Sequence, residues 1–104
     1  MMHRVLVTGS AGYLGSQVVA ELAARGDVGA IALDLREPPQ RLAGVAYEVA
    51  DIRAPEVDAI VARHRPDVVV HLASIVTPGK KSNREFEYSV DVGGTRNLLD
   101  ACIR

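Results

Sequence analysis

The chain has 104 residues, of which 48% are hydrophobic and 4% aromatic, and a formal net charge of −1 at pH 7. This length suits one domain, or part of one, with a core of aliphatic side chains. The near-zero charge gives no electrostatic reason to expect nucleic acid or an anionic membrane surface as a partner. No segment approaches the roughly 20 apolar residues of a membrane span, and the start of the chain lacks a signal-peptide core. We therefore expect a cytoplasmic protein.

Apolar runs and helical periodicities alternate along the chain. The first half predicts a strand at Arg4–Thr8, a helix at Tyr13–Ala24, a strand at Ala30–Leu33 closed by Asp34, a loop over 35–43 and a short strand at Val45–Val49. The second half predicts a helix from Pro55 with Val57, Ile60 and Val61 inward, a strand at Asp67–Leu72, a loop over 73–83 and a helix from Arg84 to Ile103. The lone cysteine, Cys102, is expected to fill space in the core, because one thiol makes neither a disulfide nor a metal site.

The alternation of strands and helices predicts an α/β fold, with a parallel sheet of about four strands flanked by helices. Sheets of this kind bind ligands outside the carboxyl ends of their strands, where the strand order reverses. The polar residues discussed below, Asp34 and Asp51 among them, each follow a predicted strand. Their shared location is the first indication of a binding site.

Three glycines, Gly9, Gly12 and Gly15, occupy the junction between the first strand and the first helix. The pattern Gly-x-x-Gly-x-x-Gly is weak by itself, but here Asp34 ends the next strand 19 residues after Gly15. This context favours a dinucleotide site. Gly9 allows a sharp turn, Gly12 lets a pyrophosphate approach the N–H groups of the helix N-terminus, and Gly15 allows close packing of helix and sheet. The alternative is a tight turn without a ligand.

Asp34 is expected to accept hydrogen bonds from the ribose hydroxyls of the adenosine, the alternative being that it merely caps a loop. A carboxylate at this place repels a 2′-phosphate, which favours NAD over NADP as the cofactor. Arg36, two residues further on, is expected to soften that preference.

With these residues, the chain resembles the N-terminal part of the NAD-dependent epimerase/dehydratase family, the extended short-chain dehydrogenases/reductases. The resemblance rests on VTGSAGYLGS (7–16), ALDLRE (32–37), DIR (51–53), VVVHLAS (68–74) and DVGGTRNLLDAC (91–102), in the order of the family. It implies a Rossmann-type sheet that is truncated relative to the full family fold. Residues 1–104 would form a partial dinucleotide-binding domain without the catalytic and substrate-binding part.

The resemblance also assigns cofactor contacts to four groups of residues. These are Gly9, Gly12, Tyr13, Leu14 and Gly15 around the pyrophosphate, Asp34, Leu35 and Arg36 at the ribose, Asp51 and Ile52 beside adenine, and Leu72, Ala73 and Ser74 toward the nicotinamide. Plainer roles stay open for three side chains: Asp51 as the cap of the next helix, Ser74 as a partner of loop backbone, and His71 as a packed, hydrogen-bonded histidine rather than a general base.

The chain departs from the family pattern in two places. Asp91 stands where the family commonly has asparagine, and the catalytic Tyr-x-x-x-Lys pair is absent. The residues four positions after Tyr13, Tyr47 and Tyr88 are Gln17, Asp51 and Val92. We therefore assign no catalytic residue, and we expect the chain to hold the NAD of a sugar-nucleotide (or similar) epimerase, dehydratase or reductase without turning over a substrate. The alternative is a catalytically inert NAD(H)-binding or interaction module.

The strand at Asp67–Leu72 is expected to have an unpaired edge, because the family places a further strand beside it. The final helix resembles the dimer-forming helices of the family. An open strand edge invites pairing with another chain, so we expect self-association.

Overall fold

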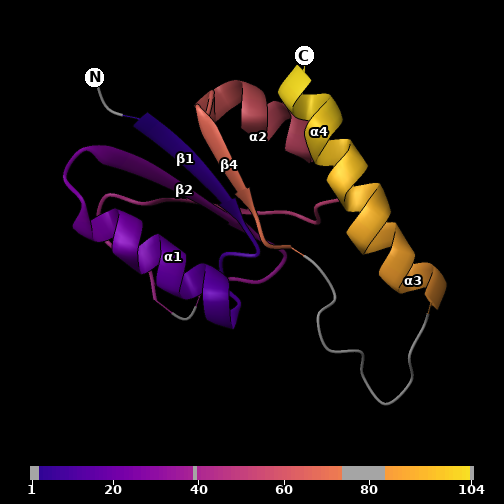
Figure 1. The fold of residues 1–104 in the computed structure, drawn as a ribbon, viewed down its shortest axis with the longest axis horizontal. Helices are drawn as coiled ribbons and strands as arrows, with labels where there is room; N and C mark the ends of the chain where they lie inside the picture. The colour runs from indigo at the N-terminus through magenta and orange to yellow at the C-terminus, as the bar shows by residue number, and fades with distance from the viewer. Residues whose placement is uncertain (1–2, 39, 74–83, 104) are drawn as a thin grey trace.

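The computed structural model describes residues 3–38, 40–73 and 84–103 (Figure 1). Along the chain, the elements are β1 (His3–Thr8), α1 (Tyr13–Ala24), β2 (Val28–Asp34), β3 (Ala46–Val49), α2 (Glu56–His64), β4 (Val68–His71), α3 (Arg84–Tyr88), a π-helical segment (Ser89–Gly94) and α4 (Thr95–Ile103). Every predicted strand and helix is present, with shifts of about one or two residues at some ends.

The four strands form one parallel sheet in the order β3-β2-β1-β4. Leu6 of β1 lies opposite Ile31 of β2 on one side and opposite Val69 of β4 on the other. The chain moves outward from β1 to β3 and then returns to the far side of β1, so the strand order reverses between β1 and β4. The predicted α/β fold is confirmed, and the crevice of such a sheet lies at the carboxyl ends of β1 and β4.

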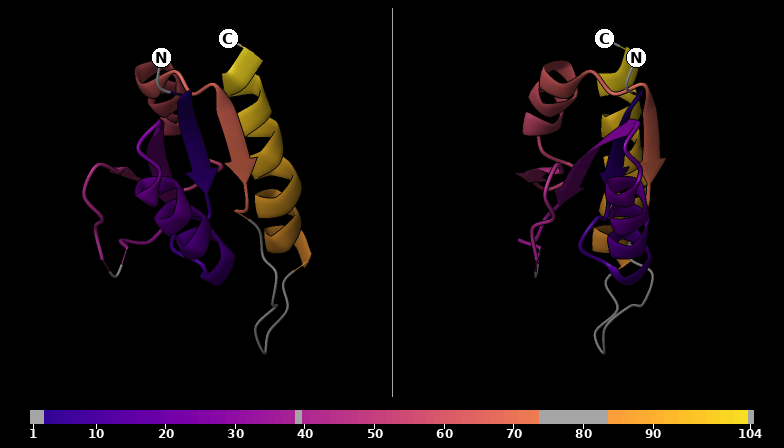
Figure 2. Two further views of the ribbon diagram at one scale, coloured as in Figure 1. Left: turned by 60° about the vertical axis from the view of Figure 1, so that its left-hand side comes forward. Right: turned by 90° about the vertical axis from the view of Figure 1, so that its left-hand side faces the viewer.

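Helices cover both faces of the sheet, α1 on one face and α2 with α4 on the other (Figures 1 and 2). Side chains of β1 alternate between these faces, as the pleat requires: Val7 packs on the α1 side, and Leu6 packs on the α2 side. The buried residues on the α2 side are Leu6, Ile31, Leu33, Ile52, Val57, Ile60, Val61, Leu98 and Ala101. The inward positions predicted for α2 are therefore confirmed. No helix in the described ranges has the length and apolar character needed to cross a membrane.

Residues 84–103, called the helical rod below, are helical throughout, as predicted, but they do not form a uniform α-helix. The middle segment, Ser89–Gly94, is π-helical. A side chain at Gly94 would overlap Cγ2 of Ile52, so this glycine lets the loop before α2 pack against the helical rod. Asn97 holds the same loop, because its Nδ2 donates to the carbonyl oxygens of Ile52 (2.9 Å) and Ala54 (2.8 Å). The rod thus fixes the loop that follows β3.

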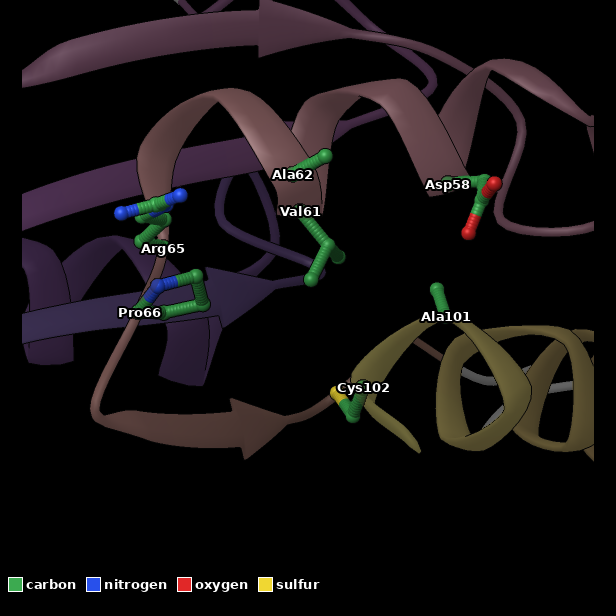
Figure 3. Close-up of a pocket in the computed structure, with 7 residues that line it drawn as sticks. All are labelled: Asp58, Val61, Ala62, Arg65, Pro66, Ala101 and Cys102. Atoms are coloured by element: carbon green, nitrogen blue, oxygen red, sulfur yellow. The ribbon is translucent and has the colours of Figure 1, made fainter. Parts of the chain in front are cut away.

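Cys102 is exposed, so the prediction that it fills space in the core is wrong. The inward positions of α4 are Leu98 and Ala101, which are 2% and 4% exposed. Each further residue of a helix is turned by about 100°, so Cys102 leaves the core face that Ala101 occupies. Cys102 lines a pocket of about 360 Å³ between α2 and α4, together with Asp58, Val61, Ala62, Arg65, Pro66 and Ala101 (Figure 3).

Candidate functional site

An open cavity of about 800 Å³ lies at the carboxyl ends of β1, β2 and β4. Twelve of the residues that the sequence assigned to a cofactor line it: Gly9, Gly12, Tyr13, Leu14, Gly15, Asp34, Leu35, Arg36, Asp51, Ile52, Leu72 and Ala73. Ser74 lies outside the described residues. The cavity also takes in residues that received no such assignment: Thr8, Leu33, Ala50, Arg53, His71, Phe86 and Val90.

The three glycines of the first turn differ in whether the fold leaves room for a side chain at their positions. Gly9 has φ +68°, and a Cβ there would lie 2.7 Å from the carbonyl carbon of Leu72, so both conformation and packing demand glycine. A Cβ at Gly15 would overlap the carbonyl oxygen of Gly9. A Cβ at Gly12, in contrast, would meet only the Gly9 oxygen, at 3.4 Å, which is an ordinary contact. The fold explains Gly9 and Gly15, whereas Gly12 keeps open a wall of the cavity.

Among the described residues, no side chain caps the N-terminus of α1. Its N-cap, Gly12, makes no side-chain hydrogen bond, and its first turn holds no acidic residue. The first turn of α2 differs, since it carries Glu56 and Asp58. Unpaired N–H groups and the helix dipole favour an anion at such an end.

Asp34 links the end of β2 to the glycine turn. Its Oδ2 accepts from the N–H of Ala11 (2.9 Å), and its Oδ1 accepts from the N–H of Arg36 (3.1 Å). The side chain is 12% exposed, and the Arg36 Nε lies 3.9 Å from Oδ1. Asp34 therefore caps backbone, which was the plainer alternative, and also lines the cavity. Each carboxylate oxygen can accept a further hydrogen bond, so the capping leaves acceptor capacity for a ligand.

Arg53 donates three hydrogen bonds to the carboxylate of Asp51. Its Oδ1 accepts from the main-chain N–H and from Nε of Arg53 (both 2.9 Å), and its Oδ2 accepts from Nη2 (2.6 Å). These hydrogen bonds lower the pKa of Asp51 and raise that of Arg53. The N-cap of α2 is Pro55, so the alternative of Asp51 as the helix cap is wrong. The carboxylate is kept ionised, as an acceptor, on the wall of the cavity.

Arg53 connects this wall to the helical rod on the far side of the cavity. Its Nη1 donates to Oγ of Ser89 (3.0 Å), and its guanidinium lies over the ring of Phe86, 5.1 Å from the centroid. The sequence analysis did not find this pair, because 33 positions separate the two residues and neither belongs to a periodic pattern. The only signal was the arginine that completes the DIR segment.

His71, which ends β4 and lines the cavity, lies between two threonines. Its Nδ1 is 2.6 Å from Thr8 Oγ1, and its Nε2 is 2.8 Å from Thr95 Oγ1. Burial lowers the pKa of His71, and the negative charge of Asp91 opposes that shift in part. Of the two alternatives, a packed, hydrogen-bonded histidine describes this environment.

A family model described as "NAD dependent epimerase/dehydratase family" matches residues 5–104. The chain is 34% identical over 106 residues to UDP-glucose 4-epimerase from Rhizobium meliloti, an alignment that covers 97% of the chain and 32% of the relative. An epimerase from Methanothermobacter thermautotrophicus superposes with TM-score 0.82 at 30% identity, over 96% of this chain and 31% of that one. A mutant uronate dehydrogenase from Agrobacterium tumefaciens, complexed with NAD, superposes with TM-score 0.80 at 28% identity, over 97% and 36%.

The chain spans about a third of the length of these relatives. The match of the family model reaches from β1 to the end of the last helix and so includes every wall of the cavity. The Rossmann-like sheet and the family predicted from the sequence are both confirmed. The chain belongs to the NAD-dependent epimerase/dehydratase family.

Proposed function

We propose that the cavity binds NAD, and that the chain is the NAD-binding portion of an epimerase, dehydratase or reductase acting on a sugar nucleotide or a similar substrate. The observation that supports this most directly is Gly12. Gly12 lines the cavity. Within the described ranges, the nearest atom that a Cβ at this position would meet is the Gly9 carbonyl oxygen, 3.4 Å away, so the packing of the protein does not require a glycine here. A diphosphate at the uncapped N-terminus of α1 would use that space.

The remaining walls suit the other parts of the cofactor. The acceptor capacity left on Asp34 suits the two ribose hydroxyls, and its charge disfavours a 2′-phosphate. The ionised Asp51 accepts hydrogen bonds only, which suits the amino group of adenine. Leu72 and Ala73, at the end of β4, would lie toward the nicotinamide, which, when bound, accepts and returns a hydride.

We further propose that these residues bind and orient the cofactor but perform no proton transfer of their own. The chain has no tyrosine followed four residues later by lysine. His71, the titratable side chain at that end of the cavity, has both ring nitrogens engaged by threonines. Incubating the chain with NAD and UDP-glucose, and following both NADH absorbance and epimerisation of the sugar against a blank, is expected to show no turnover.

Binding is tested by titrating NADH into the 104-residue chain and following its fluorescence, with NADPH as the comparison and calorimetry as the check. We expect saturable binding of NADH and weaker binding of NADPH. Absence of binding by either nucleotide would overturn the proposal and favour the interaction module, whose only support here is the missing catalytic pair. Equal affinities for NADH and NADPH would be consistent with dinucleotide binding but would contradict the proposal that Asp34 disfavours a 2′-phosphate.

A further inference from the structure

The hydrogen bonds around Thr8 favour one arrangement of protons. Its Oγ1 is 2.9 Å from the main-chain nitrogen of Leu72 and 3.1 Å from that of Ala73, and both of these groups can only donate; the Leu72 N–H lies nearer to Oγ1 than to the main-chain oxygen of Thr8, which is 3.2 Å away. A hydroxyl oxygen has two lone pairs, so these two N–H groups fill its acceptor capacity. The hydroxyl proton of Thr8 must then point to Nδ1 of His71, which lies 2.6 Å away.

This direction settles which nitrogen of the imidazole carries the proton. Nδ1 receives the hydroxyl of Thr8, so it is unprotonated, and the neutral ring must carry its hydrogen on Nε2. Nε2 then donates to Thr95 Oγ1, 2.8 Å away, and Thr95 donates in turn to the carbonyl oxygen of Asp91 (2.6 Å). A protonated ring would place two donors against each other at Nδ1. In the part of the chain that the structure describes, the charged group that acts on this ring is Asp91, and burial of the ring outweighs the effect of Asp91 on the pKa of His71.

This series of hydrogen bonds joins the helical rod to the part of the cavity wall formed by Leu72 and Ala73. Thr95 belongs to α4 and does not line the cavity, whereas Leu72 and Ala73 do. The same two peptides lie directly against Gly9, where even a Cβ would approach Leu72 to 2.7 Å. Because Thr8 takes up both N–H groups, this stretch of wall has no N–H left to bind a ligand. Its position relative to the glycine turn is fixed instead.

We propose that His71 is a positioning residue: held as the neutral tautomer with hydrogen on Nε2, it transmits the position of α4 through Thr8 to the peptides of Leu72 and Ala73. The tautomer follows from the hydrogen bonds alone. The effect on ligand affinity rests on the proposed function of the cavity. Thr95, outside the cavity, therefore contributes to NADH binding.

The tautomer is tested on the unmodified chain by ¹H–¹⁵N correlation spectra of the histidine side chains, in which protonated and unprotonated ring nitrogens have distinct shifts. His71→Gln identifies the signals of His71 among those of the three histidines. We expect an unprotonated Nδ1 and a protonated Nε2. Thr8→Ser keeps the hydroxyl and is expected to keep this pattern, and Thr8→Val is expected to lose it. A ring protonated on Nδ1, or one averaging between tautomers in the unmodified chain, would overturn the proposal.

The connection to the cavity is tested by Thr95→Val and Thr95→Ser in NADH titrations. The valine variant is expected to bind NADH roughly three- to tenfold more weakly, and the serine variant to restore affinity. Unchanged affinity in the valine variant would contradict the connection. If the unmodified chain binds no NADH, the proposed function fails, whereas the spectra still decide the tautomer.

Discussion

The carboxylate of Asp34, at the end of β2, accepts a hydrogen bond from the main-chain N–H of Ala11 in the turn after β1, at 2.9 Å. The hydrogen bond joins two segments that lie 23 positions apart, and it holds the acidic residue beside the glycine turn. One side chain thus contributes to the shape of the turn and, in our proposal, also to the choice between NAD and NADP.

Asp34→Asn is expected to weaken NADH binding and to reduce the preference for NADH over NADPH. The amide keeps one oxygen for Ala11 but loses the charge and half of the acceptor capacity. A hydrogen bond to a charged group contributes about 1.5–3 kcal/mol, so we expect a loss of about tenfold or more in NADH affinity. Asp27→Asn is the matched control, because Asp27 is 72% exposed and forms its ion pair with Arg25, outside the cavity. An unchanged NADH/NADPH ratio in Asp34→Asn would contradict the role of the charge.

Two glycines of the first turn can be tested separately, because packing of the protein requires Gly15, whereas we assign Gly12 to ligand binding. Gly12→Ala is expected to change the free energy of unfolding by less than about 1 kcal/mol, since its φ of −76° suits alanine. The same change is expected to abolish measurable NADH binding, because the methyl group occupies the space assigned to the pyrophosphate. Gly15→Ala is the contrasting variant. Its Cβ would overlap the backbone of Gly9, and we expect destabilisation by about 3 kcal/mol.

Denaturant unfolding and NADH titration of both glycine variants check these expectations. Gly26→Ala provides the control, because nothing lies within 4 Å of the added Cβ. A stable Gly12→Ala variant that still binds NADH with full affinity would show that the diphosphate does not lie against this turn.

The parts of the site that could be predicted from the sequence are those set by short-range geometry. The glycine spacing and the acid at the end of the next strand are local features, and parallel strands bring their carboxyl ends to one edge. The contacts of Arg53 with Phe86 and of His71 with Thr95 depend instead on where the helical rod passes over the sheet. That course depends on Gly94 and on the π-helical segment, which hydrophobic periodicity does not reveal. The misplacement of Cys102 has the same origin, since an apolar helical run alone does not say which face meets α2.

Arg53 is expected to control which base the cavity accepts. It fixes the orientation of the Asp51 carboxylate and fills both acceptor positions of Oδ1, which leaves Oδ2 to accept from an amino group. The chain should therefore prefer NADH over the reduced hypoxanthine dinucleotide, which offers a carbonyl at that position, by about tenfold. Arg53→Met should reduce this preference, whereas Arg41→Met, outside the cavity, should not. Equal affinities of the unmodified chain for both dinucleotides would contradict the contact.

Glu48 of β3 is expected to give the fold a stability that depends on acidic pH. Its Oε2 accepts from Nε2 of His64 (2.6 Å) and from Nη1 of Arg63 (2.8 Å), and the hydrogen bond from His64 is the main reason that its pKa lies below 4.5. Above pH 4.5 the carboxylate is ionised in both states, and the stabilisation is fully present. As the pH falls further, the unfolded chain takes up the proton first, and the stabilisation is lost.

The pH dependence of Glu48 is measured by urea unfolding of the chain and of Glu48→Gln between pH 7 and pH 3. The difference in free energy of unfolding between the two is expected to shrink below about pH 4.5. A difference that stays constant over this range would show that the carboxylate has the same pKa in the folded and unfolded states.

Self-association is expected to proceed through β4 and the rod beside it. In the described part of the chain, β4 is an edge strand with Val68 50% exposed, and α4 exposes Leu99 (57%) and Ile103 (82%). Open strand edges and exposed aliphatic side chains both favour contact with a second copy. Leu99→Gln combined with Ile103→Gln should shift sedimentation velocity profiles toward the monomer, and Arg96→Gln on the same helix should not. If the unmodified chain sediments as a monomer from micromolar to millimolar concentrations, these side chains do not form an interface between copies.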